Sequence, residues 1–575
     1  MILYLNKIRQ LLSRRQKKAL LLLAFLLVIG MFFEVLGLGV LLPMITLILN
    51  PSKVQDFLNE ISYLDSLTID QNEIVWGGLI LIVGTYLVKT FFLVFITYKQ
   101  NAIIEGLGAH LSMRLYRKYL YQSYSYHINR DLSEIIKNIQ IEIGYYTFFC
   151  NALLMLMVEI ALTISVLATV VYIEPMASIT VACLFGLLAI IYIQSTKRKI
   201  KKWGDNRQNL DKNISKIILE SLSGIKQVKL LSKEMFFKNQ YDRTVSKRAK
   251  ISSSYQTFIQ LPRFYLELIA VLGLVVFIQI MFYKGSSSQQ IISTLGLFVA
   301  ATFRMIPSIN RILSSLQNLK YYSSSIDVIF KEFKNEKEIV DDSQPSPIDF
   351  KHQITIQDLF FSYENQEVLK SINIKIEKGE TVGIIGESGS GKSTLVDLIN
   401  GLLVPTKGTI YVDNIDINAF ENNWKEHLGY VGQDIFLLDD TIVSNVAFGI
   451  EKDRIDESRL DYALKTSQIN EFVEGLPEGK LSNVGERGVK LSGGQKQRIG
   501  IARALYNTPE VLIFDEATAA LDGKTEKEVI NAIYSLKNKK TIIMIAHRLS
   551  TLSKCDKIYE IKKGEAHIKE KINVV

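Results

Sequence analysis

Two short segments carry residue types that could bind and cleave a nucleotide. The first, Gly386–Ser393, reads GESGSGKS and follows the apolar run Thr381–Ile385. It fits the pattern Gly-x4-Gly-Lys-Ser/Thr, in which glycines let backbone N–H groups approach phosphates closely. The helix that follows adds partial positive charge at its N-terminus. We therefore predict a buried parallel strand, a phosphate-binding loop and a helix start, in that order.

The second segment is the apolar run Val511–Phe514, which ends in Asp515 and Glu516. An acid at the carboxyl end of a strand can hold the shell of Mg²⁺, and Asp515 suits that role. Glu516 would then polarise the attacking water, while Lys392 would contact the β- and γ-phosphates of ATP and Ser393 would ligate Mg²⁺. The plainer alternatives are a chance glycine-rich turn and a solvated loop start. The strand and helix context favours the functional interpretation.

A third segment, Leu491–Gln495, reads LSGGQ and lies between the other two. In this order the three motifs resemble the ABC transporter superfamily, and the resemblance covers residues 354–575. In that superfamily the LSGGQ loop closes over ATP bound to a second subunit. The resemblance therefore implies a dimer, with ATP and Mg²⁺ as cofactors.

Other positions match the superfamily one by one. Tyr363 resembles the aromatic residue that stacks on adenine, Gln433 the glutamine that senses Mg²⁺, and His547 the switch histidine that contacts the γ-phosphate. Asp522 resembles the conserved acid of the D-loop, although Ala519 stands where serine is common. The resemblance implies catalytic roles for Glu516, His547 and Gln433 and Mg²⁺ contacts for Ser393, Gln433 and Asp515. The implied nucleotide-binding set is Tyr363, Gly386, Glu387, Ser388, Gly389, Ser390, Gly391, Lys392, Ser393, Thr394, Ser492, Gly493, Gly494, Gln495 and Asp522.

Composition places this ATPase on a membrane protein. The chain has 575 residues, of which 48% are hydrophobic, and a net charge of +9. It is too long for one ordinary domain and too apolar for a purely soluble protein. A basic chain could bind nucleic acid, but much of the Lys and Arg flanks apolar segments, so anionic lipid is the simpler partner. Cys150, Cys183 and Cys555 lack metal-site spacing and predict no disulfide framework.

Apolar segments recur along the first half and predict an all-α transmembrane domain of six helices. The cationic start favours cytoplasmic termini in a bacterial inner membrane, without a cleavable signal. Two intervening segments, Tyr124–Asp131 and Lys229–Met235, are candidates for helices that couple this domain to the ATPase. We predict a transmembrane domain at 1–333, a linker at 334–353 and an α/β P-loop ATPase domain at 354–575. The predicted spans are 19–49, 74–98, 145–173, 176–196, 257–283 and 290–312.

Charged residues inside membrane spans are costly and usually functional. Lys89, Arg263, Arg304 and Arg311 fall towards the inner leaflet, estimated from a helix rise of about 1.5 Å per residue. Such a basic recess suits a lipid with an anionic head. The alternative is that these side chains simply reach out to the headgroups at the interface. Glu34 is left unassigned because nearby glycines and Pro43 could mark a helix irregularity.

Four segments resemble the bacterial flippases of lipid-linked oligosaccharides (the PglK group): Leu42–Leu47, Pro262–Glu267, Arg304–Arg311 and Tyr321–Asp327. The resemblance implies a homodimer that uses ATP to move a polyprenyl-pyrophosphate-linked oligosaccharide from the inner to the outer leaflet. Such flipping serves protein glycosylation or surface glycan assembly and involves no nucleic acid. Lys89 stands where this group has arginine, and a lysine ammonium does not make the bidentate phosphate contact of a guanidinium.

Other functions stay open on the sequence alone. The nearest is a lipid A or multidrug exporter of the same fold, which a cavity of aromatic residues without aligned cations would favour. A peptide exporter with a cysteine-peptidase domain is disfavoured because no soluble domain precedes Ala19. A soluble ABC ATPase in translation or DNA repair is disfavoured by the six apolar segments.

Overall fold

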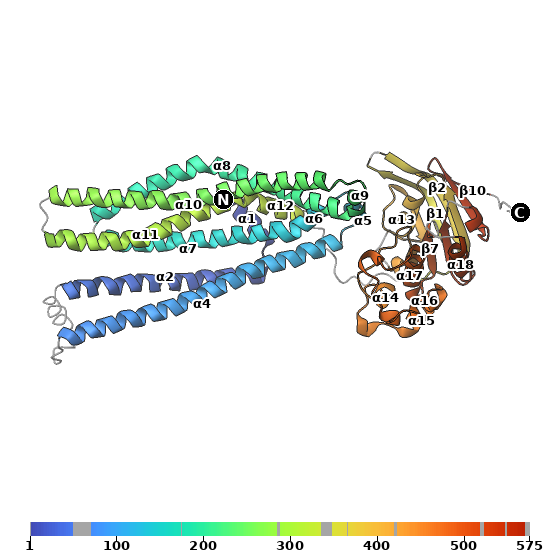
Figure 1. Cartoon of the computed structure of the whole chain (residues 1–575), viewed down its shortest axis with the longest axis horizontal. Helices are drawn as coiled ribbons and strands as arrows, with labels where there is room; N and C mark the ends of the chain where they lie inside the picture. Colours follow the sequence, from blue (N-terminus) through green and yellow to red (C-terminus); the bar gives the residue numbers. More distant parts are fainter. Residues whose placement is uncertain are drawn as a thin grey trace. The chain divides into compact units, whose positions relative to one another are not determined.

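The computed structural model describes residues 2–49, 71–173, 175–283, 288–334, 348–364, 366–418, 423–517, 523–546 and 549–569. The chain divides into two compact units. Unit 1 comprises Met1–Gln122 and Asn129–Ile339, and unit 2 comprises Ser123–Ile128 and Val340–Val575. Unit 1 is helical and unit 2 combines sheets with helices (Figure 1), which confirms the predicted fold class.

Long helices make up most of unit 1. Each of the six predicted spans lies inside one of them. The long helices are α2 (Arg14–Leu49), α4 (Gln71–Leu120), α7 (Ile143–Ile173), α8 (Pro175–Ser223), α10 (Glu234–Tyr283) and α11 (Ser288–Tyr321). Within the described residues, four stretches are long and apolar enough to cross a membrane: Arg14–Phe33, Trp76–Leu120, Leu132–Ser165 and Glu234–Tyr283. The six-span arrangement and its orientation stay predictions.

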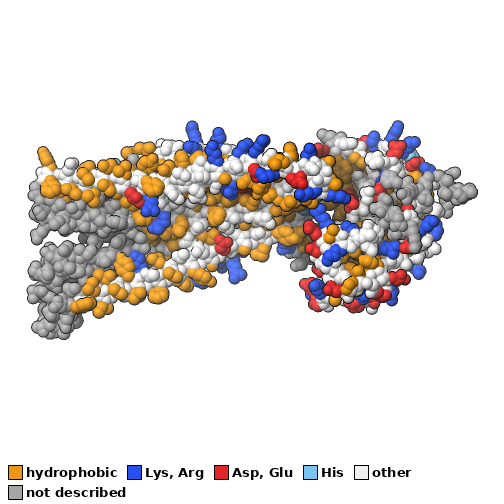
Figure 2. Space-filling view, in the orientation of Figure 1, with side chains coloured by type: hydrophobic (Ala, Val, Ile, Leu, Met, Phe, Trp, Pro, Cys, Tyr) orange, Lys and Arg blue, Asp and Glu red, His pale blue; other side chains and the backbone are white. Residues whose placement is uncertain are grey.

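Much of the outer surface of these helices is apolar. Figure 2 shows hydrophobic side chains along much of their visible length. Phe91 of α4 and Val271 of α10, for example, are largely exposed. Exposed apolar surface of this extent is rare on soluble monomers and marks a surface that contacts another apolar phase. Helices suit a membrane because they satisfy all their backbone hydrogen bonds internally.

Shorter helices connect the long ones. They are α1 (Ile2–Leu11), α5 (Tyr124–Ile128), α6 (Leu132–Lys137), η1 (Asn138–Glu142), α9 (Ile225–Leu230) and α12 (Ser323–Lys334). Asp131 caps α6, because its carboxylate accepts a hydrogen bond from the Ser133 backbone N–H. The η1 segment is a single turn of π-helix between α6 and α7. The buried side chains of Lys137 and Glu142 form an ion pair of 3.1 Å across this turn.

A buried arginine joins four helices of unit 1. The Arg207 guanidinium on α8 lies 3.7 Å from the ring centre of Tyr145 on α7 and 4.9 Å from that of Tyr321 on α11. It also donates a hydrogen bond to the Ser325 hydroxyl on α12. Asp211, one turn along α8, lies 3.7 Å from the same guanidinium. A buried charge is tolerated when it is paired and stacked in this way.

Unit 2 contains two sheets. The antiparallel sheet has the order β2-β1-β4-β5, with β1 (Gln353–Tyr363), β2 (Gln366–Glu377), β4 (Lys407–Val412) and β5 (Ile415–Asp416). The second sheet has the order β10-β9-β3-β8-β7-β6, and all its neighbours are parallel except β10 with β9. Its strands are β3 (Thr381–Gly386), β6 (Leu428–Val431), β7 (Val511–Asp515), β8 (Thr541–Ile545), β9 (Lys557–Lys562) and β10 (Glu565–Lys569).

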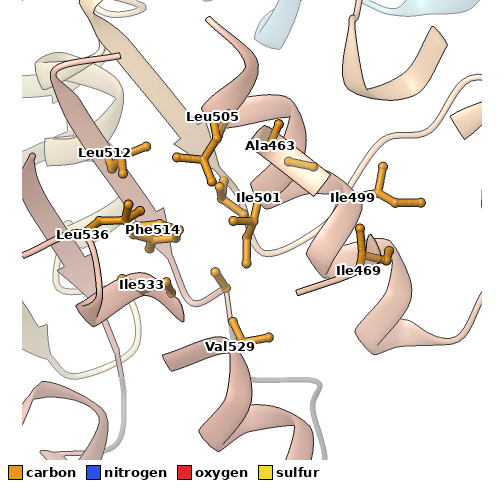
Figure 3. Packing of buried hydrophobic residues seen from close by; sticks show 14 of the residues in the cluster. Ala463, Ile469, Ile499, Ile501, Leu505, Leu512, Phe514, Val529, Ile533 and Leu536 are labelled. Atoms are coloured by element: carbon orange, nitrogen blue, oxygen red, sulfur yellow. The ribbon is translucent and has the colours of Figure 1, made fainter. Parts of the chain in front are cut away.

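Helices cover the second sheet, and two cores hold unit 2 together. One core joins the antiparallel sheet, β3 and α13, and it also buries Ile348 and Phe350. The other joins β7 and β8 to α15, α17 and α18 (Figure 3). The helices are α13 (Lys392–Ile399), α14 (Ile442–Val446), α15 (Glu457–Thr466), α16 (Asn470–Glu474), α17 (Gly493–Tyr506) and α18 (Gly523–Tyr534). The 3-10 turns are η2 (Trp424–His427), η3 (Lys452–Arg454), η4 (Gly479–Leu481), η5 (Glu486–Gly488) and η6 (Leu549–Leu552).

Candidate nucleotide and cargo sites

The phosphate-binding loop and the acidic strand end lie at the same edge of the parallel sheet. Ile545 at the end of β8 pairs with Ile384 of β3 on one side and with Asp515 of β7 on the other. The loop begins at Gly386, the last residue of β3. Ligands of parallel sheets bind at the carboxyl ends of their strands, so the geometry supports the predicted nucleotide site.

The loop has the close backbone packing that its glycines predict. A Cβ atom on Gly386 would lie 2.4 Å from the Ile561 carbonyl oxygen, and Gly391 has φ +101°. The Lys392 ammonium donates hydrogen bonds of 2.9 Å to the carbonyl oxygens of Gly386 and Glu387. The Ser390 hydroxyl is buried and has no hydrogen-bond partner in the described part of the chain. A buried polar atom of this kind at the loop fits a phosphate-bearing ligand.

Ser393 and Asp515 form the proposed Mg²⁺ contact. The Ser393 hydroxyl donates a hydrogen bond to the Asp515 carboxylate, and Tyr430 contacts the same carboxylate at 3.5 Å. Burial, followed by the negative charge of Glu516, raises the pKa of Asp515. A divalent cation beside these groups would relieve this charge repulsion, so the residues present fit Mg²⁺.

Glu516 follows β7 in an uncommon backbone conformation. Its φ is +49°, and its N–H donates a hydrogen bond of 3.1 Å to the Ile545 carbonyl oxygen. Non-glycine residues adopt this conformation at some energetic cost and do so often at functional sites. The bond to β8 fixes the residue beside Asp515, where sequence analysis predicts the catalytic carboxylate.

The LSGGQ segment forms the start of α17. Ser492 is its N-cap and accepts a hydrogen bond from the Gln495 N–H at 3.3 Å, while the Gln495 side chain accepts one from the Ser492 N–H at 2.8 Å. This reciprocal arrangement is a capping box. The Gln495 side chain therefore holds the loop in shape. Gly493 and Gly494 occupy the first turn, where helix N–H groups can bind an anion.

Several predicted residues stand at the surface or outside the described part. Gln433 is exposed in the turn after β6, and its neighbour Gly432 accepts a bond of 3.4 Å from Gln497 of α17. Tyr363 ends β1, with its ring 4.9 Å from that of Phe361. Asp522 and His547 lie outside the described residues.

Sequence analysis missed two residues beside the Mg²⁺ contact. They are Tyr430, which touches Asp515, and Asp397 of α13. Burial, followed by the charge of Asp515, raises the pKa of Asp397 to about 6. The motifs assign neither residue a role beside Asp515, so only the packing of α13 and β6 against β7 could reveal it.

The predicted cargo residues of unit 1 already have partners. Arg263 pairs with Glu267 at 2.8 Å, and Arg311 pairs with Glu159 at 2.5 Å. Sequence analysis missed both carboxylates. The Lys89 ammonium lies 4.8 Å from the ring centre of Tyr86. Arg304 is part of α11, but its side chain, like that of Glu34, lies outside the described residues.

Arg311 also lines a groove between α7 and α11. The groove has a volume of about 270 Å³. We call it the α7–α11 groove, and its lining residues are Phe148, Asn151, Ala152, Met155, Arg311, Ser314, Ser315, Asn318 and Tyr322. Its wall on α7 is mostly apolar, whereas its wall on α11 carries hydroxyl, amide and guanidinium groups. Such a groove can hold a ligand that has both apolar and polar faces.

Comparisons with known proteins agree with both halves of this description. The family pattern "ABC transporter transmembrane region" matches residues 13–306, and the pattern "ABC transporter" matches residues 369–519. The ATP-dependent lipid A-core flippase of Saccharophagus degradans is 30% identical over 488 residues, which are 80% of this chain and 81% of the relative. A flippase with the same name from Cupriavidus metallidurans is 28% identical, over 85% of this chain and 83% of its own. Another from Francisella novicida is 33% identical, over 65% of this chain and 64% of its own.

The fold has a counterpart among solved structures. A bacterial Atm1-family ABC exporter with ATP bound matches with a TM-score of 0.77, at 23% identity, over 96% of this chain and 94% of that one. The transmembrane pattern covers 294 of the 575 residues, just over half. The chain therefore belongs to the ABC transporter family, with the exporter-type fold of a transmembrane domain followed by an ATPase domain, and is an ATP-hydrolysing transporter.

Proposed function

We propose that this transporter is a flippase that moves a phosphorylated glycolipid from the inner to the outer leaflet of a bacterial inner membrane. One observation carries the proposal: relatives named lipid A-core flippases align with 80% or more of the chain, so the alignment extends beyond the ATPase domain. The apolar helices and the α7–α11 groove are in keeping with a lipid cargo. Lipid A-core is therefore the first candidate.

The relatives favour the alternative from sequence analysis over its main prediction, a polyprenyl-pyrophosphate-linked oligosaccharide. Both cargoes combine long hydrocarbon chains with phosphate and sugar. The cationic residues Lys89, Arg263 and Arg311 suit either one. The short resemblances in α2, α10 and α11 keep the oligosaccharide as the second candidate.

Hydrolysis requires two copies of the chain in this proposal. Lys392 of one protomer holds the phosphates, and Ser492 of its partner closes the site with the N-terminus of α17. Mg²⁺, when bound, would be held by Ser393 and Asp515 and would offset phosphate charge. Glu516 orients the water for attack.

Transmission to the membrane uses the predicted coupling segments. Ser123–Ile128, which contains α5, groups with unit 2 rather than with the helices that flank it in sequence. Burial, followed by the charges of Asp397 and Tyr363, raises the pKa of Tyr124. The nearby charges of Asp397 and Tyr363 support a role for this segment in responding to bound nucleotide.

Reconstitution into proteoliposomes tests the cargo. We would measure the ATP-dependent movement of lipid A-core, a polyprenyl-pyrophosphate-linked oligosaccharide and a hydrophobic drug, with Glu516→Gln as the inactive control. We expect lipid A-core to move and to stimulate ATP hydrolysis. If only the lipid-linked oligosaccharide moves, the oligosaccharide is the cargo. If only the drug moves, neither proposed lipid is the cargo.

A further inference from the structure

We propose that Glu159 competes with the cargo for Arg311, so that the α7–α11 groove admits only lipids with a doubly charged phosphate. The inference rests on the proposed function for the identity of the cargo, but its phosphate selectivity can be tested with other lipids. In this inference Glu159 positions the Arg311 side chain and thereby selects the lipid headgroup. No sequence motif assigns such a role to Glu159.

The contact itself is the first support. Glu159 of α7 is 5% exposed at its side chain, and one of its oxygens lies 2.5 Å from the Nε atom of Arg311. Its other oxygen is buried without a hydrogen-bond partner in the described residues. Arg311 is 44% exposed and lines the groove. The carboxylate thus lies in the interior, while its arginine remains accessible to a ligand.

The shape of the groove is the second support. Its volume of about 270 Å³ is near the lower end of ligand pockets, about 300 Å³. It therefore suits a headgroup rather than a whole lipid. Ser314, Ser315 and Asn318 follow Arg311 along α11, beyond the end of the predicted span at 312. Hydroxyl and amide groups at this depth match the sugar of a headgroup, and the Phe148 ring offers an apolar face.

Charge decides which headgroup can enter. Arg311 already holds a carboxylate, so a ligand must offer a stronger acceptor than the one it displaces. A phosphate monoester carries about −1.5 to −2 charge at neutral pH, whereas the diester of an ordinary phospholipid carries a single negative charge. Glu159 therefore excludes the phospholipids that surround the protein in excess, and a doubly charged phosphate can replace it.

A matched pair of lipids tests the selectivity. Phosphatidic acid, a monoester, and phosphatidylglycerol, a diester, would be compared with identical acyl chains, by binding to the full-length protein in phosphatidylcholine nanodiscs. The wild-type protein should prefer phosphatidic acid. In Glu159→Gln, binding of phosphatidylglycerol should strengthen about tenfold, which corresponds to 1.4 kcal/mol, and the preference should shrink. An unchanged preference in a folded Glu159→Gln protein would overturn the inference.

Further variants separate selection from folding. Arg311→Gln and the double variant Glu159→Gln/Arg311→Gln should bind both lipids equally weakly, because Glu159 acts through Arg311. If Glu159→Gln fails to fold, Glu159→Asp should shift the preference in the same direction, since its shorter side chain draws the carboxylate away. Asp242→Asn, which breaks the exposed pair of Lys238 and Asp242 at 2.7 Å, is the control that should change nothing.

The result is independent of the cargo assay. If lipid A-core is not flipped but Glu159→Gln still loses selectivity, the proposed cargo is wrong and the inference holds. If lipid A-core is flipped and the selectivity of Glu159→Gln equals that of the wild type, the inference is wrong and the proposed function holds.

Discussion

The nucleotide site and the α7–α11 groove are built by different means. At the nucleotide site, backbone geometry places the working groups: the end of β3, the strained Glu516 and the capped start of α17. In the groove, side chains from two separate helices meet. Arg311 is held there by an ion pair with Glu159, which is far away in sequence. A site of the first kind can be recognised from a short sequence motif. A site of the second kind can be recognised only once the packing of the helices is known.

The difference has a physical origin. A loop that wraps phosphate needs glycines at set positions and a helix directly after it, so its pattern is recognisable from one segment. An ion pair between two helices needs only one acidic and one basic residue at the same level along the helix axes. Many combinations along α7 and α11 would meet that condition, so no spacing identifies the pair.

The largest expected effect is at the motif-encoded site. Replacing Glu516 by Gln removes the carboxylate that orients the water and should lower ATP turnover by about 10²- to 10⁴-fold. ATP binding should persist, because Lys392 and the loop are unchanged. Turnover and nucleotide binding measured on the same purified sample check both parts. Turnover within threefold of wild type would remove Glu516 from its catalytic role.

A second prediction concerns stability and contrasts two ion pairs. Arg311→Ala leaves the buried Glu159 without its partner and should destabilise the protein by about 2 kcal/mol, less than for a fully buried pair. Arg263→Ala breaks an exposed pair and should cost less than about 1 kcal/mol. Unfolding by denaturant in detergent measures both. Equal losses would mean that burial does not distinguish these pairs.

A third prediction concerns the signature loop. Ser492→Ala removes the N-cap of α17 and should cost about 1 kcal/mol of stability, whereas Ser492→Thr should retain the cap. The unfolding midpoint of nucleotide-free protein separates this effect from any loss of ATP contact. If Ala and Thr variants unfold alike, the capping box does not stabilise the helix.

The last expected effect depends on pH. Because the pKa of Asp397 is raised from 3.8 to about 6 in the folded protein, its ionisation destabilises the fold as pH rises from about 4 to about 6. Asp397→Asn should therefore unfold at a higher temperature than wild type at pH 7.5 without nucleotide. The difference should shrink as the pH falls to about 4 and vanish below the unfolded-state pKa of 3.8. A constant difference across this range would exclude Asp397 as its source.

Sequence alone predicted much of unit 2 and less of unit 1. Thr381–Ile385 is a parallel strand and Lys392 begins a helix, as the P-loop pattern requires. Tyr430 and Asp397 were missed because their role comes from the order of β6, β7 and β3 across a sheet. Arg263 and Arg311 were identified as intramembrane cations, but Glu267 and Glu159 were overlooked. Glu267, one helical turn after Arg263, could have been found from spacing; Glu159 could not.

The single turn of π-helix at η1 joins α6 to α7 and accommodates one extra residue between them. Each residue of an α-helix advances the chain by about 100°, and a π turn accommodates one residue more than an α turn. Deleting one residue from Asn138–Glu142 would let the turn relax to an α-helix without rotating α7 by much, because the π turn already absorbs that residue. Deleting one residue from α7 itself would have no such turn to absorb it. It would rotate the face that carries Phe148, Met155 and Glu159 by about 100° relative to α6.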